Sequence, residues 1–214
     1  MSGRFFRVIR GAERSLLERT YPNNAVCLLC GRAAGGELLC PDCRKGLEAC
    51  ALPEDEHAVW LYRDEAGRLV RMLKERAVAP AAEILARGIA EKLRKLDVPA
   101  DAVITSVPMP VLRRRERGID HGWKLALALG AETGYPVRPL LKRKARSAKT
   151  QRGLSAEERL KNMRDAFAPL DGIPKTVILM DDVMTTGATA AACRETLTAA
   201  GCERVIVLAA TRAE

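Results

Sequence analysis

Long apolar runs and aromatic side chains are both scarce in this sequence. No stretch reaches the roughly 18 apolar residues of a membrane-spanning helix, so we expect no integral membrane segment. The arginine-rich residues 1–19 contain no continuous apolar core, which argues against a secretory signal and for a cytoplasmic protein. In that compartment the seven cysteines are not expected to form structural disulfides. An aromatic content of only 4% disfavours base stacking as the main source of any nucleic-acid affinity.

Internal repeats and low-complexity tracts are also absent, and the composition is that of an ordinary folded protein. The 214 residues, 48% of them hydrophobic, suffice for one α/β domain with a small appendage. The net charge of +9 is unevenly distributed, because residues 110–165 hold 15 lysines and arginines against 6 acidic residues. This basic block indicates a polyanionic partner, either a pyrophosphate group or a nucleic acid, unless it is only a solvated surface.

Four cysteines form two Cys-x-x-Cys pairs with nine residues between the pairs: Cys27, Cys30, Cys40 and Cys43. Each short loop can present two thiolates to one metal ion, which is the arrangement of tetrahedral zinc sites. With four cysteine ligands no coordination position is left for catalysis, so we expect structural zinc that supplies folding free energy to a zinc-ribbon-like module over residues 21–52. The module is either a brace only or also a contact for nucleic acid.

The most informative stretch is an apolar run followed by acids and a threonine-rich turn. Residues 177–180 predict a buried parallel strand that ends where Asp181 and Asp182 begin. The turn that follows precedes an alanine-rich helix, and its candidate ligand-binding residues are Thr185, Thr186, Gly187, Ala188 and Thr189. Backbone N–H groups at such a helix start can bind a phosphate, and the paired carboxylates can accept hydrogen bonds from a vicinal diol. Phosphate and diol at one strand end describe a ribose 5-phosphate, whereas the alternative is a solvated strand end with a threonine-rich cap.

These residues resemble the 5-phosphoribosyl-1-pyrophosphate (PRPP) motif of type I phosphoribosyltransferases, and further matches resemble the ComF family (ComFC or GntX-like). The resemblance implies a type I phosphoribosyltransferase fold, a mostly parallel sheet flanked by helices, over residues 53–214. Tyr62 and Lys74 match a Tyr and a Lys of the family, although Glu75-Arg76-Ala77 replaces the aromatic residue and glycine that usually follow.

After a predicted strand at residues 102–107, the segment from Pro108 onward is similar to the loop that grips pyrophosphate. The resemblance assigns this role to Pro108, Arg113, Arg114, Arg115, Arg117 and Gly118. The guanidinium groups of the arginines suit diphosphate oxygens. ComF proteins usually continue Gly-Phe-Asn-Gln, whereas this chain has Gly118-Ile119-Asp120-His121. His121 is either a helix-start residue without chemistry or a catalytic group.

A basic segment after a predicted strand at residues 137–141 resembles the flexible hood that closes over PRPP. Its residues with family spacing are Arg143, Lys149, Gln151, Arg159 and Asn162. Closure would exclude water from a developing ribosyl cation. A cationic flap could equally follow the phosphates of a single DNA strand.

Smaller features complete the expectations. A helix is predicted over residues 81–96, and its apolar stripe of Ile84, Leu85, Ile89 and Leu93 is expected to face the core. An amphipathic helix over residues 4–17, in an N-terminal segment ending near residue 20, is expected to dock on the body or contact a membrane surface or nucleic acid. The other cysteines, Cys50, Cys193 and Cys202, are most simply buried apolar residues or idle thiols.

The resemblance leaves more than one function open. A ComF-type protein would bind PRPP with Mg²⁺ and act in DNA uptake during natural transformation, contacting single-stranded DNA, and a protein of the competence machinery could be a further partner. The alternatives are a true phosphoribosyltransferase with an unidentified nitrogen acceptor and a non-catalytic PRPP-sensing regulator.

Overall fold

The computed structural model describes residues 26–76, 78–110, 118–144 and 166–214. The chain divides into two compact units, the first ending at Ala49 and the second beginning at Cys50. In the first unit, a knuckle of turns leads into helix α2 (Pro41–Glu48), which begins directly after Cys40. The predicted helix over residues 4–17 lies outside the described residues.

The second unit is built on a four-stranded parallel sheet with the order β1-β6-β5-β2. Its strands are β1 (Ala58–Leu61), β2 (Val103–Ser106), β5 (Thr176–Met184) and β6 (Arg204–Arg212). Single bridges extend the pairing at both edges, from Ala51 to Trp60 and from Val137 to Ile104. A parallel sheet needs helices on its faces, and its central strand is accordingly an unbroken buried run from Thr176 to Met180. The predicted α/β class is confirmed.

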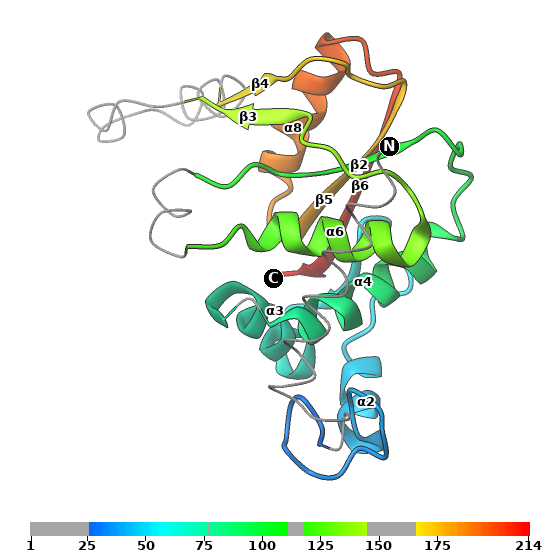
Figure 1. The fold of residues 1–214 in the computed structure, drawn as a ribbon, viewed down its shortest axis with the longest axis vertical. Coiled ribbons are helices and arrows are strands. Elements are labelled where there is room, and N and C mark those ends of the chain that lie inside the picture. The colour runs from blue at the N-terminus through cyan, green and yellow to red at the C-terminus, as the bar shows by residue number, and fades with distance from the viewer. Residues whose placement is uncertain (1–25, 77, 111–117, 145–165) are drawn as a thin grey trace, which may run out of the picture. The chain divides into compact units, whose positions relative to one another are not determined.

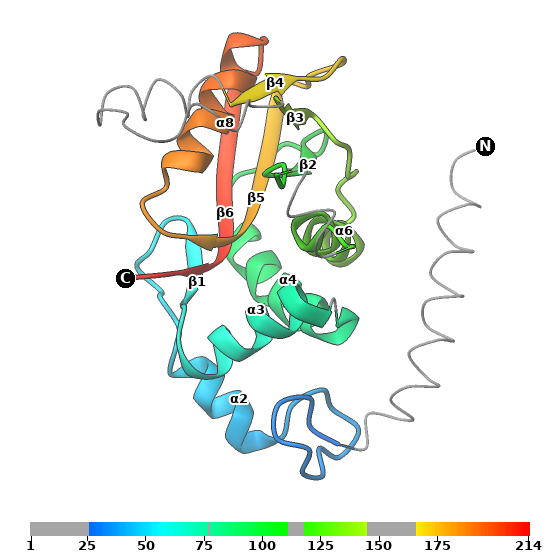
Figure 2. The same ribbon diagram turned by 90° about the vertical axis from the view of Figure 1, so that its left-hand side faces the viewer.

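Helices cover both faces of this sheet (Figure 1 and Figure 2). They are α3 (Asp64–Arg76), α4 (Ala79–Leu93) and α6 (His121–Thr133) on one face and α8 (Ala188–Ala199) on the other. The predicted apolar stripe of α4 is buried, with Ile89 at 0% exposure. Packing between α4 and β1 is so close that a Cβ on Gly88 would lie 2.1 Å from Trp60 Cη2.

Two strand predictions were wrong. β5 does not end before the acids but continues through Asp181 and Asp182 to Met184, because β6 still pairs with it after β2 has ended at Ser106. Instead of a strand at residues 137–141, Val137 makes one parallel bridge to Ile104. The strand that follows is β3 (Leu141–Arg143), which pairs antiparallel with β4 (Phe167–Pro169) in a separate two-stranded sheet.

Among the described residues, no helix combines the length and the apolar character that crossing a membrane requires.

Candidate functional site

The acid pair lies on the part of β5 that extends beyond its neighbour β2. The last β2 partner of β5 is Ser106, opposite Met180, and the N–H of Val107 then donates to the Met180 carbonyl at 2.9 Å. Pro108, the first residue of the predicted pyrophosphate loop, therefore leaves the sheet beside the acids. The carboxyl ends of parallel strands are where open α/β sheets bind ligands, so these acids stand at the expected edge.

The two acids point to opposite faces of the sheet, because successive side chains alternate along a strand. Val177 and Leu179, which share the parity of Asp181, pack in one apolar cluster with Cys193 and Leu197 of α8. Asp182 faces the other way, toward α3 and α6. The two carboxylates therefore have different neighbours.

Asp182 is buried and contacted by two cationic or potentially cationic side chains. Lys74 Nζ, in the last turn of α3, lies 3.2 Å from its Oδ1. His121 Nε2, in the first residue of α6, lies 2.7 Å from its Oδ2. The Asp182 side chain is 8% exposed and that of His121 12%. The carboxylate thus joins three elements, and we call these three residues the Asp182 cluster.

Burial alone would raise the pKa of Asp182, but hydrogen bonding from His121 and the charge of Lys74 outweigh it and hold the pKa below its ordinary value. Asp181 behaves oppositely: burial, together with the negative charge of Asp182, raises its pKa to about 7. Adjacent residues of one type therefore have different electrostatic surroundings. Lys74 also lies 6.0 Å from the centre of the Tyr62 ring, so the two residues that match the ComF pattern are neighbours.

The turn between β5 and α8 presents backbone donors. Gly187 has a left-handed φ of 75°, which glycine adopts without steric cost, and directly precedes α8. No side chain caps this helix start and no acidic residue lies in its first turn. Thr185 and Thr186 are exposed, and the Ala188 N–H makes only a long 3.4 Å bond to Thr186 Oγ1. We call residues 185–189 the threonine turn; its donors suit an anion.

The structure describes only part of the other predicted site residues. Gly118 is exposed with a left-handed φ of 68°. Arg143 is the last residue of β3, with its guanidinium 5.1 Å from the centre of the Phe167 ring. The remaining residues lie outside the described residues: Arg113, Arg114, Arg115, Arg117, Lys149, Gln151, Arg159 and Asn162.

The four cysteines of the first unit converge as their spacing predicts. Their sulfur atoms all lie within 4.8 Å of one another, and Cys30 Sγ is 3.6 Å from Cys40 Sγ. A tetrahedral zinc ion with Zn–S bonds of about 2.3 Å requires sulfurs about 3.8 Å apart, so the cluster fits this metal. A hydrogen bond from the Arg32 side chain lowers the pKa of Cys30 to about 6, which favours the thiolate that binds metal.

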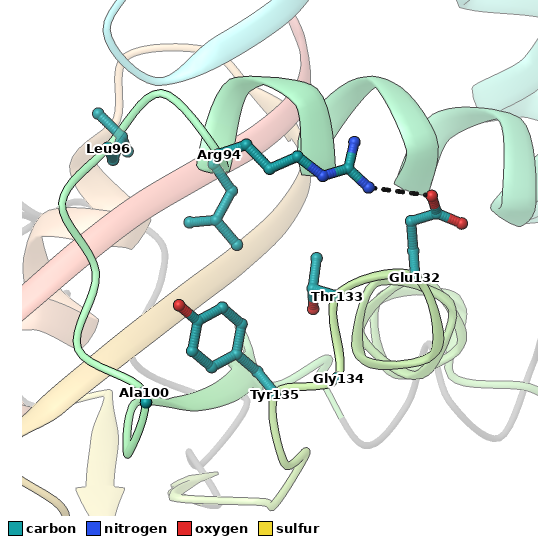
Figure 3. A pocket seen from close by; sticks show the side chains of 8 residues that line it. Arg94, Leu96, Ala100, Glu132, Thr133, Gly134 and Tyr135 are labelled. Carbon is teal, nitrogen blue, oxygen red and sulfur yellow. Dashed lines mark hydrogen bonds and ion pairs between the residues drawn. The ribbon is translucent and has the colours of Figure 1, made fainter.

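A cavity of about 480 Å³ lies elsewhere in the second unit, between the ends of α4 and α6 (Figure 3). Tyr135 and Thr133 line it, and the Arg94–Glu132 ion pair of 3.2 Å borders it. Because α6 begins at His121 and ends at Thr133, the cavity is about 18 Å along the helix from the Asp182 cluster. It is therefore separate from the site at the carboxyl edge of the sheet.

Comparison with known proteins finds relatives that are named for DNA utilization and for competence. The chain is 29% identical over 187 residues to the DNA utilization protein YhgH of Salmonella typhi, covering 78% of this chain and 81% of the relative. It is 31% identical over 128 residues to Competence protein F of Haemophilus influenzae, covering 58% of this chain and 55% of that protein. The resemblance to the ComF family is confirmed. The chain thus spans just over half the length of Competence protein F, and no family model matches the sequence.

Solved structures similar to this ComF-like chain include phosphoribosyltransferases. An adenine phosphoribosyltransferase from Leishmania tarentolae has a TM-score of 0.43 at 13% identity, covering 76% of this chain and 94% of that one. The allosteric regulatory enzyme of purine biosynthesis has a TM-score of 0.42 at 22% identity, covering 60% of this chain and a quarter (25%) of that one. Both scores are low. The structure itself shows a parallel sheet flanked by helices, with a strand–turn–helix unit at Gly187, and a separate four-cysteine unit.

Sequence reasoning missed two contacts of the second unit. It left the role of His121 open, and nothing in the local sequence shows that this residue meets Asp182, 61 positions later. It also missed Asp55, which accepts hydrogen bonds from the backbone of His57 and Ala58 and from Arg212 at the end of β6. Of the two residues that contact Asp182, only Lys74 was indicated by the sequence, through its match to a lysine of the family.

Proposed function

We propose that this ComF-like protein binds PRPP with Mg²⁺ at the carboxyl edge of its sheet and acts in DNA uptake during natural transformation, where it contacts single-stranded DNA. The observation that carries the PRPP proposal is the threonine turn, with uncapped donors at the start of α8, three residues after an acid pair. The names of the relatives, a competence protein and DNA utilization proteins, support the biological role.

In this proposal the 5-phosphate of PRPP binds the backbone N–H groups of the threonine turn, and the ribose diol meets the acid pair. Mg²⁺ prefers oxygen ligands, so the carboxylates of the acid pair would hold it directly or through water, and it would offset the negative charge of the pyrophosphate. The loop that begins at Pro108 would face the pyrophosphate. Zinc in the four-cysteine cluster would hold the first unit together, because so short a segment has little apolar core of its own.

Calorimetric titration with PRPP and Mg²⁺, with and without single-stranded DNA, tests the ligand and its coupling to DNA. We expect saturable binding by the natural chain and about two- to tenfold weaker binding by T186A, the usual effect of one lost hydrogen bond. Thr198→Ala is the matched control, because Thr198 is an exposed threonine near the other end of α8. If both variants bound PRPP as tightly as the natural chain, a contact between Thr186 and PRPP would be contradicted.

The DNA contact is tested with a fluorescent oligonucleotide at two salt concentrations. Low aromatic content predicts phosphate-led binding that weakens steeply with salt and hardly depends on base sequence. Lys142→Glu, at an exposed residue of the basic block, should weaken it. Lys175→Glu is the control, because Lys175 is also exposed but lies outside the block. A flat salt response would contradict the DNA proposal.

The alternatives share the ligand and differ in turnover. A phosphoribosyltransferase would release pyrophosphate from labelled PRPP when a nitrogen acceptor is present, by displacement at C1 in a site that acts mainly through positioning and charge. A PRPP-sensing regulator would bind PRPP without turnover and without DNA affinity. Incubation of labelled PRPP with nucleobases and small amines separates the first alternative from the second.

A further inference from the structure

The threonine turn follows a strand end that has one neighbouring strand. β2 ends opposite Met180, so among the described residues the last part of β5, residues 181–184, pairs only with β6. That pairing runs to the last residue of both strands, where Met184 pairs with Arg212, and the Ala213 N–H then donates to the Met184 carbonyl at 2.9 Å. Met184 directly precedes the threonine turn. The position of the turn therefore depends on where the end of β6 is held.

Met184 also contacts the turn through its side chain. Its Sδ would lie 3.8 Å from a Cβ added to Gly187, so the thioether packs against the residue that opens α8. The residue is buried, with 5% exposure. Because protein interiors are close-packed, a displacement of Met184 would be transmitted to Gly187 and to the backbone donors beside it.

The end of β6 is fixed by an ion pair with a residue that precedes β1. Arg212 donates from Nη2 to Asp55 Oδ1 at 3.1 Å and from Nε to Oδ2, so the contact is bidentate. The Asp55 side chain is 13% exposed and that of Arg212 32%. Oδ1 also accepts the backbone N–H groups of His57 at 2.8 Å and Ala58 at 2.7 Å. The Asp55 carboxylate therefore joins the start of β1 to the end of β6.

Backbone bonds alone hold the end of β6 weakly on its β1 side. β1 ends at Leu61, which pairs with Arg212, and the Tyr62 N–H donates to the Arg212 carbonyl at 2.7 Å. Strand ends that few bonds hold open locally at little cost. A partly buried, bidentate contact restricts Arg212 more than an exposed ion pair would, because the backbone of His57 and Ala58 already fixes the carboxylate.

Resting on the proposed function, we infer that Asp55 and Arg212 are positioning residues for the PRPP site. Their ion pair holds the end of β6, the end of β6 holds Met184, and Met184 holds the threonine turn in the geometry that binds the 5-phosphate. Neither residue of the pair contacts the ligand. Loss of the pair should therefore alter the turn before any ligand is added.

A double-mutant cycle with two readouts tests this inference. D55N, R212Q and the double variant are compared with the natural chain by the backbone amide NMR signals of residues 185–188 without ligand and by calorimetric titration with PRPP and Mg²⁺. We expect each single variant to shift these signals and to weaken binding about three- to tenfold. The double variant should bind no more weakly than the weaker single variant, because the same contact is lost in all three. E132Q is the matched control and should change neither readout, since it breaks the Arg94–Glu132 ion pair near the C-terminal end of α6.

Unchanged turn signals and affinity in D55N and R212Q, with both variants folded by thermal unfolding, would overturn the positioning role. Losses that simply add in the double variant would also overturn it, because the two residues would then act separately. R212K keeps the charge without the bidentate contact, so it should show smaller but measurable changes and tests the inference if R212Q does not fold. Failure of the natural chain to bind PRPP would overturn the proposed function, whereas the amide signals, measured without ligand, would still decide whether the ion pair positions the turn.

Discussion

The two neighbouring acids should respond with opposite sign to the same substitution. D182N removes a carboxylate that contacts Lys74 and His121, two side chains that are 25% and 12% exposed. Breaking one partner out of a buried ion pair typically costs about 3–5 kcal/mol, and the partial exposure of Lys74 reduces the expected loss to about 3 kcal/mol. D181N instead removes an acid whose pKa is raised by burial to about 7.

The sign for Asp181 follows from linkage. An acid with a raised folded-state pKa binds a proton in the folded protein that it has already lost in the unfolded chain, so its ionisation opposes folding as the pH rises from about 4 toward 7. Asparagine cannot ionise and keeps the oxygen that accepts the Asp182 N–H. We therefore expect D181N to stabilise the protein near pH 7.5, by at most about 4 kcal/mol, and by little at pH 4.

Urea denaturation with zinc present, followed by tryptophan fluorescence, measures both effects. Trp60 in β1 and Trp123 in α6 are the two tryptophans, and both lie in the unit that contains the acids. Curves at pH 5 and 7.5 for D181N, D182N and the natural chain give the free energies of unfolding. Equal destabilisation by the two variants, or a D181N effect that is independent of pH, would refute the reasoning.

Three further predictions concern the zinc unit, the packing of the sheet and an ion pair. Cys43→Ser should lower the zinc content measured by metal analysis and chelation should unfold the first unit, whereas Cys202→Ser, in a thiol outside the cluster, should retain zinc. Gly88→Ala should destabilise the protein by about 1–3 kcal/mol in thermal unfolding, because the added Cβ would overlap Trp60. Gly122→Ala is the control and should not destabilise it, because the nearest atom to its Cβ lies 3.6 Å away. Equal melting temperatures for the two variants would contradict this prediction. Asp55→Asn should cost about 2 kcal/mol at pH 7, because burial would raise the pKa of Asp55 but the bonds from Arg212 and two backbone N–H groups hold it low. That contribution is present above about pH 4 and lost on acidification, so the difference from the natural chain should shrink below pH 4 in denaturation curves.

Local patterns predicted a large part of the fold. The apolar run before Asp181 gave the central strand, the stripe at Ile84, Leu85, Ile89 and Leu93 gave the buried face of α4, and the threonine–glycine turn gave the start of α8. These predictions succeeded because each depends on residues that are close in sequence. The end of β5 was misjudged because strand length here is set by β6, which continues to pair after the apolar run is over.

The sequence by itself determined that four thiolates can surround one metal ion and that acids precede a phosphate-suited turn, since short spacings fix which groups can meet. Only the tertiary structure decided that Asp181 and Asp182 face different helices and that Lys74 and His121 take the second acid between them. Those contacts join residues about 60 to 110 positions apart. The physical reason is that the neighbours of each carboxylate depend on the pleat of the strand and on the packing of helices against it. A local sequence pattern specifies neither of these.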